Sequence, residues 1–157
     1  MPDMLVRLYR LPPLQEAMER MEREGIVLRR AQPYEKRVVT GFIERHFSAA
    51  WADETSVAFA RQPVTAFIAL AENRIVGFGA YECTRRGYFG PTGVAEDFRG
   101  RGIGYALLLA CLYGMWEMGY AYAIIGGAGP VDFYRRAVNA EVIEDSVPGI
   151  YTRIPEG

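Results

Sequence analysis

Histidine, cysteine and lysine are scarce in this chain of 157 residues. Its one histidine is His46, and its two cysteines, Cys83 and Cys111, lie far apart without a Cys-x-x-Cys spacing. These side chains cannot assemble a metal site of the usual ligand spacing. The sequence therefore predicts no bound metal and two buried free thiols.

Long hydrophobic runs and a large net charge are also missing. The longest apolar stretch, residues 103–116, is interrupted by glycines and is too short to span a bilayer. The first residues lack the basic segment and apolar run of a secretion signal. The net charge of −1 gives no general attraction to nucleic acid or anionic lipid. We therefore expect a cytoplasmic protein that binds neither nucleic acid nor membranes.

What the sequence does have is the composition of a globular domain. Half of its residues are apolar and 24% are charged, a balance that allows a chain of this length to bury a core. No internal repeat, low-complexity tract or Gly/Ser-rich linker divides it. We expect one domain over residues 1–157.

Helix and strand signals follow one another in an order typical of an α+β domain around one mixed sheet. Apolar residues at helical spacing predict helices over residues 14–24, 33–47, 53–60, 103–118 and 130–138. Strands are predicted over residues 4–10, 26–28, 65–71, 74–83, 87–94, 120–125, 140–144 and 150–154. Glu72-Asn73 is a good two-residue hairpin turn. Because proline cannot donate to a sheet ladder, Gly90-Pro91 predicts a bulge or an edge.

The turn between the strand that ends at Val94 and the helix that begins near Ile103 carries the most information. Its three glycines, at positions 100, 102 and 104, let backbone amides approach a ligand closely. A helix start adds unpaired N–H groups and positive potential, and Arg99 and Arg101 add charge. This pattern favours a site for a diphosphate or a similar anion. A turn that only packs a helix on a sheet has the same local pattern.

Two familiar nucleotide motifs do not fit this turn. The nucleotide P-loop requires a Gly-Lys-Ser/Thr sequence, and the only lysine of the chain is Lys36. The dinucleotide fingerprint requires glycine at position 105, where Tyr105 stands. It also requires a carboxylate about 20 residues later, and residues 120–123 contain none.

The pattern Arg99-x-x-Gly102-x-Gly104 after Val94 resembles the acetyl-CoA signature of the GCN5-related N-acetyltransferases, the GNAT family. Glu96 stands where the family commonly has a proline. The resemblance covers roughly residues 25–155 and leaves residues 1–24 as an N-terminal extension.

A second block follows in the order that the family has. Residues 120–127 are similar to its later strand, and Phe133-Tyr134 to the aromatic pair on its next helix. Gly126-Gly127 replace the polar residue that often precedes this helix, which leaves one cofactor contact open.

The resemblance implies a bacterial-type single-domain acetyltransferase. Its fold would be a central mixed, mostly antiparallel sheet of six to seven strands, flanked by helices, with a bulge in the strand that holds the cofactor. Its activity would be direct transfer of an acetyl group from acetyl-CoA to a primary amine of a small molecule or peptide. Neither Cys83 nor Cys111 has a base nearby in the sequence, which disfavours a cysteine nucleophile.

The resemblance also implies a role for each site residue. The backbone N–H of Val94 would contact the oxyanion, and Tyr134 would be the general acid that protonates the CoA thiolate. Cofactor binding would involve Gly93, Val94, Arg99, Gly100, Arg101, Gly102, Ile103, Gly104 and Tyr105.

The acceptor half of the site stays open at this stage. The candidate general bases are Glu82, Glu96, Asp53, Glu54, His46 and water. Candidate residues of the acceptor pocket are Phe47, Trp51 and Phe59. The oligomeric state is also open, with a homodimer as one option. Two other functions remain: a catalytically silent sensor that binds CoA or acyl-CoA, and a purely structural domain.

Overall fold

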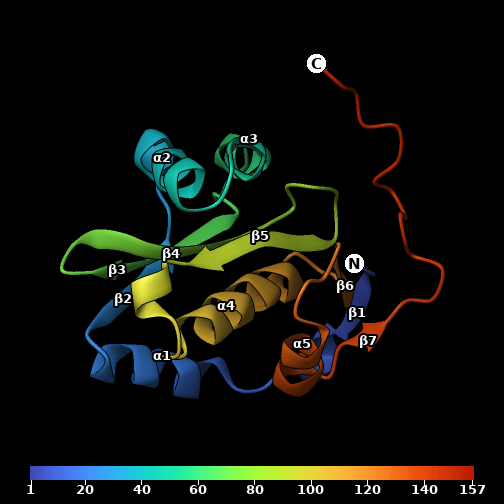
Figure 1. Ribbon diagram of the computed structural model, residues 1–157. Helices are drawn as coiled ribbons and strands as arrows, with labels where there is room; N and C mark the ends of the chain where they lie inside the picture. The colour runs from blue at the N-terminus through green and yellow to red at the C-terminus, as the bar shows by residue number, and fades with distance from the viewer.

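Seven strands form one sheet in the order β2-β3-β4-β5-β6-β1-β7 in the computed structural model, which describes residues 1–157 (Figure 1). The strands are β1 Met4–Arg7, β2 Ile26–Arg30, β3 Ala66–Ala71, β4 Arg74–Tyr81, β5 Tyr88–Val94, β6 Tyr122–Ile125 and β7 Glu141–Val142. Only β5 and β6 are parallel neighbours, and every other pair is antiparallel. The predicted mixed, mostly antiparallel sheet is therefore confirmed.

Helices cover both faces of this sheet. The α-helices are α1 Leu14–Arg23, α2 Lys36–His46, α3 Ala49–Ser56, α4 Ile103–Glu117 and α5 Val131–Val138. Short 3-10 turns lie at η1 Leu8–Arg10, η2 Pro33–Glu35, η3 Val57–Ala60 and η4 Glu96–Phe98. Helices α1, α4 and α5 lie on one face and α2 and α3 on the other (Figure 1). Each face has its own hydrophobic core. No helix combines the length and the apolar character that crossing a membrane requires.

The turn and the bulge that the sequence predicts in the middle of the sheet are both present. Glu72 and Asn73, with φ of 49° and 62°, form the expected two-residue turn between β3 and β4. The register between β4 and β5 shifts between Gly79, opposite Thr92, and Tyr81, opposite Phe89. Two residues of β5, Gly90 and Pro91, therefore stand against one residue of β4. The expected bulge is present at this dipeptide.

The first 24 residues are built into the fold. Strand β1 lies between β6 and β7, and the side chains of Met4 and Val6 have no exposed surface. Helix α1 packs against α4 through Ala17 and Met21 in the same core. The division at residue 24 remains a prediction about the family pattern, but these residues contribute a strand and a helix to the sheet and its core.

The C-terminal part differs from the sequence prediction. Residues 150–154 form no strand, and the strand predicted over residues 140–144 is reduced to Glu141–Val142. Tyr151 and Ile154 are exposed, so neither a neighbouring strand nor a hydrophobic core stabilises a strand there. We refer to residues 143–157 as the C-terminal segment.

Candidate active site

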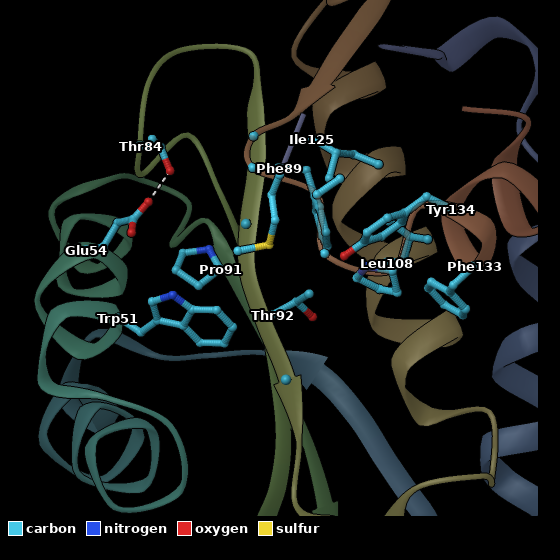
Figure 2. A pocket seen from close by; sticks show the side chains of 18 of the residues that line it. Trp51, Glu54, Thr84, Phe89, Pro91, Thr92, Leu108, Ile125, Phe133 and Tyr134 are labelled. Carbon is cyan, nitrogen blue, oxygen red and sulfur yellow. Dashed lines mark hydrogen bonds between the residues drawn. The ribbon is translucent and has the colours of Figure 1, made fainter. Parts of the chain in front are cut away.

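A cavity of about 770 Å³ opens where β5 and β6 separate (Figure 2). The two strands pair only through Tyr88 with Ile124 and Phe89 with Ile125. Beyond this point β6 ends, whereas β5 passes through its bulge and continues to Val94. The bulge thus lies at the start of the gap that forms the cavity.

The cavity reaches both faces of the sheet. Leu108 and Tyr134 line it from the side of α4 and α5, and Trp51 and Glu54 from the side of α3, with β5 between the two groups (Figure 2). Part of the C-terminal segment, with Tyr151, completes the wall. Two reactants can therefore approach β5 from opposite faces and meet in one cavity.

The glycine-rich turn has the backbone that anion binding requires. Gly100 and Gly102 have φ of +82° and +83°, in the left-handed region that favours glycine, and Gly102 is the residue before the first turn of α4. None of the backbone N–H groups of residues 100–105 donates to an acceptor within the chain. A Cβ at Gly104, which lines the cavity, would meet only Val94 Cγ2, at 3.7 Å. Free donors beside open space fit the diphosphate of CoA.

Three arginines surround this turn. Arg99 Nε donates to the carbonyl oxygen of Val94 at 3.3 Å, and Arg101 lies over the Phe98 ring at 4.9 Å. The third, Arg20, comes from α1, and its guanidinium lies against Gly102. None of the three forms an ion pair with a carboxylate. Sequence reasoning missed Arg20, because nothing in a local pattern indicates that α1 packs beside the turn.

The backbone N–H of Val94 points into the gap between β5 and β6. Ala95 N–H donates to the carbonyl oxygen of Val76 at 2.8 Å. Val94 stands opposite Gly77 in this antiparallel ladder. Because N–H groups alternate in direction along a strand, that of Val94 faces away from β4. Gly93 and Val94 both line the cavity.

The other predicted cofactor residues lie in or beside the turn and do not line the cavity. They are Arg99, Gly100, Arg101, Gly102, Ile103 and Tyr105. The Ile103 side chain is buried in the core, so only its backbone can reach a ligand.

Tyr134 has the environment of a buried phenol with a free hydroxyl. It is 6% exposed on α5, lines the cavity, and points its oxygen toward β5 (Figure 2). The rings of Phe89 and Phe133, with centroids at 6.3 and 5.2 Å, hold it in place. The hydroxyl forms no hydrogen bond within the chain. Burial raises the pKa of Tyr134 to about 12, so the phenol is neutral at physiological pH.

Among the candidate bases, Glu54 is the carboxylate that lines the cavity. It is half-buried on α3, and the hydroxyl of Thr84 donates to its Oε1 (Figure 2). Glu82, by contrast, is 3% exposed and has a structural role. It accepts the backbone N–H of Gly87 at 2.6 Å and the hydroxyl of Tyr120 at 3.2 Å.

The remaining candidate bases lie outside the cavity. Asp53, on the same helix as Glu54, is exposed, and so is Glu96 in η4. His46 is exposed at the end of α2, with its ring centroid 4.5 Å from that of Phe42.

Of the three aromatic residues expected around the acceptor, only Trp51 lines the cavity. Phe47 packs behind it, with ring centroids 5.5 Å apart, and also covers Gly93. Phe59 packs against the core between the sheet and α2 and α3. Of the three candidates, Phe47 and Phe59 are therefore used to fill that core.

Neither cysteine lines the cavity. Burial raises the pKa of Cys83 to about 12 and raises that of Cys111 as well. A thiol is nucleophilic as the thiolate, so both residues are in surroundings that suppress this reactivity.

Asp3 fixes the loop on the β6 side of the cavity. Its Oδ1 accepts the backbone N–H of Gly127 at 2.8 Å, and its own N–H donates to Ser146 Oγ at 2.9 Å. The first strand thus holds both the Gly126-Gly127 loop and the C-terminal segment. No local pattern in the sequence indicates this link, because its partners are far apart along the chain.

The sequence and the fold are similar to those of known proteins. Residues 62–137 match the acetyltransferase (GNAT) domain model. No curated protein matches the sequence. Over 90% of its length the chain is similar to a GCN5-related glucosamine N-acetyltransferase region in a fungal multi-domain β-N-acetylglucosaminidase, with a TM-score of 0.73 and 18% identity over 19% of that chain.

Two bacterial structures are also similar. A GCN5-related N-acetyltransferase from Sphaerobacter thermophilus gives a TM-score of 0.63 with 23% identity over 90% of this chain and 48% of that chain. A GNAT family acetyltransferase from Brucella melitensis in complex with acetyl-CoA gives a TM-score of 0.57 with 19% identity. This match covers 71% of this chain and 80% of that chain. The chain thus spans less than half of the first two proteins. The chain has the fold of the GNAT acetyltransferases, and the match to their domain model lies within residues 62–137.

Proposed function

We propose that this chain, with its GNAT acetyltransferase domain, moves an acetyl group from acetyl-CoA to a primary amine. One observation carries the proposal. A single cavity extends from Gly104, at the end of the glycine turn with its free backbone donors, to a buried tyrosine whose hydroxyl has no partner in the chain. A purely structural turn would need neither the free donors nor the cavity.

The turn and its arginines would hold the CoA diphosphate. The amides of residues 100–105 supply donors at a helix N-terminus, including those of Ile103 and Tyr105. Arg20, Arg99 and Arg101 supply positive charge that no carboxylate of the chain neutralises. Gly93, Val94 and Gly104 line the path along which the pantetheine arm would enter the gap.

Val94 would stabilise the charge that develops during transfer. Its N–H faces the gap between β5 and β6, where a thioester carbonyl oxygen can accept it. Removing one such donor costs roughly 10²–10³ in rate in well-studied acyl transfers. A backbone donor on a rigid strand needs no rearrangement when the charge appears.

The proton balance requires one base and one acid. The amine nitrogen forms a bond to the carbonyl carbon of the thioester, and the C–S bond breaks. A primary ammonium group loses two protons in the course of the reaction, and the CoA sulfur gains one. Glu54, the carboxylate in the cavity wall, would receive the protons of the amine directly or through water, and Tyr134 would donate to the sulfur. Bulk water then exchanges with both residues, with the net release of one proton.

The surroundings of the two cysteines support direct transfer of the acetyl group, without an acyl-enzyme. Both are buried outside the cavity and have raised pKa values, so neither can carry the acetyl group.

Two measurements separate this function from its alternatives. Acetyl-CoA and CoA should raise the melting temperature, because a ligand of the folded state stabilises it. Acetyl-CoA together with a panel of amines should then release free CoA. A thermal shift without CoA release for any amine indicates a CoA-binding sensor. The absence of any shift at saturating ligand indicates a structural domain.

A further inference from the structure

The acceptor side of the cavity has one charged side chain. Glu54 is the only acidic or basic residue among those that line the cavity, and no lysine, arginine or histidine is present. An acceptor with its own carboxylate would find no cationic side chain to pair with and would face Glu54. Like charges that are brought together out of water repel each other strongly.

Glu54 itself lacks a cationic partner. The three ion pairs of the chain lie elsewhere, and the neutral hydroxyl of Thr84 is the donor to its Oε1. Tyr151 lines the same cavity, and burial and the charge of Glu54 both raise its pKa. A half-buried carboxylate with free acceptor capacity is complementary to an ammonium group.

The wall around Glu54 is aromatic and apolar. Trp51 lies beside Pro91 in the cavity (Figure 2). Phe47 and Phe78 support its indole, with ring centroids at 5.5 and 6.4 Å, so the ring cannot turn inward to the core. Its free side and the Tyr151 ring offer flat apolar surfaces to a ligand. Aromatic faces also attract an ammonium group.

We infer that the acceptor is a monoamine with an apolar, preferably aromatic, body and no carboxylate. This inference rests on the acetyltransferase function proposed above. One carboxylate pairs with one ammonium, so the second charge of a diamine would be desolvated without a partner. The hydroxyls of an amino sugar would also lose their hydrogen bonds with water against this wall.

Matched amine pairs test this selectivity with the wild-type protein and acetyl-CoA. 2-Phenylethylamine and phenylalanine differ by a carboxylate, hexylamine and 1,6-diaminohexane by a second amine, and cyclohexylamine and glucosamine by hydroxyls. The release of free CoA gives kcat/KM for each amine, and mass spectrometry confirms the N-acetyl product. The first member of each pair should be better by about tenfold or more, the usual effect of one unpaired polar group.

Two variants connect the selectivity to Glu54. Glu54→Gln keeps an oxygen for the Thr84 hydroxyl and removes the charge. It should lower kcat, because Glu54 is also the proposed base, raise KM for 2-phenylethylamine about tenfold, and reduce the ratio of kcat/KM for this amine to that for phenylalanine. Asp53→Asn, one residue away but exposed and outside the cavity, should leave all three quantities unchanged.

The outcomes distinguish this inference from the function on which it rests. Efficient acetylation of phenylalanine, 1,6-diaminohexane or glucosamine, at or above the rate of the matched monoamine, overturns the inference and leaves the acetyltransferase function in place. An unchanged preference in Glu54→Gln also overturns it. Acetyl-CoA binding without acetylation of any amine in the panel overturns both.

Discussion

The guanidinium of Arg20 lies against the backbone of Gly102, so close that a methyl group at position 102 would come within 2.7 Å of Nη1. Arg20 is in α1, outside the segment that matches the GNAT domain, and Gly102 is in the centre of the glycine turn. A helix from the start of the chain therefore brings a positive charge to the proposed diphosphate site.

Arg20→Ala should weaken acetyl-CoA binding about tenfold, since a hydrogen bond to a charged group is worth roughly 1.5–3 kcal/mol and this side chain is exposed. Titration calorimetry at low and high salt measures the change, and the difference between the proteins should shrink as salt screens the charge. Arg23→Ala, one turn further along the same helix, is the matched control. Equal affinity of the Arg20 variant and the wild-type protein would show that Arg20 does not contact the ligand.

Gly104→Ala should fold normally and bind acetyl-CoA at least about tenfold more weakly. A Cβ there meets only ordinary van der Waals contact at 3.7 Å and occupies the space through which the ligand would pass. Gly102→Asp should also lose acetyl-CoA binding, but it should unfold more easily than Gly104→Ala. A residue with a Cβ is destabilised by roughly 1–2 kcal/mol at the φ of +83° that Gly102 adopts. Melting temperatures and acetyl-CoA titrations of both variants test this difference. Normal affinity in Gly104→Ala contradicts the proposed path.

Tyr134→Phe should reduce kcat about a hundredfold or more and leave acetyl-CoA affinity near that of the wild-type protein, as expected for the loss of a general acid. The Phe89 and Phe133 rings would still hold the side chain, so the fold should be retained. Tyr120→Phe removes a hydroxyl that bonds Glu82 outside the cavity and serves as the control. A variant with full kcat at every pH would make Tyr134 a structural residue.

The raised pKa of Tyr134 predicts where activity is lost at high pH. The phenol can donate only while it is protonated, so kcat should not fall near the ordinary tyrosine pKa of about 10, and should decline only toward about 12. The folded protein holds this proton more tightly than the unfolded chain. Its contribution to stability is therefore complete below about pH 10 and decreases as pH rises toward 12. Rate profiles with denaturation curves at each pH test both effects. A decline of kcat centred at the ordinary tyrosine pKa, in protein that is still folded, contradicts the assignment.

Cys83→Ala and Cys111→Ala should each retain the kcat of the wild-type protein, because neither thiol lines the cavity. Intact mass spectrometry after incubation with acetyl-CoA should find no acetylated enzyme. An acetyl group on either cysteine that an amine removes would instead establish a two-step mechanism.

The parts of the fold that the sequence predicted are those set by neighbouring residues. Glu72-Asn73 forms its hairpin, Gly90-Pro91 forms its bulge, and the glycine turn opens α4. In each case the conformation follows from glycine, proline or turn residues within a few positions, so a single sequence is enough.

The parts that the sequence did not predict depend on packing between distant segments. Arg20 meets Gly102, and Asp3 meets Gly127, only because helix and strand elements are placed together by the whole sheet. Aromatic residues near the acceptor site divide between core and cavity in the same way. Phe47 fills the core and Trp51 faces the cavity, although the two are four positions apart on adjoining segments.

The position of β1 has a consequence for how the protein is made. Asp3 is synthesised 124 residues before its partner Gly127. The strand therefore waits, without its hydrogen-bonding partners, until β6 has been synthesised. Contacts over such separations form slowly, because the connecting chain must first be ordered. The walls of the cavity that contain Gly127 and Tyr151 can thus form only after the glycine turn has been synthesised, so the segment proposed to hold the diphosphate is made before the segments that enclose the cavity.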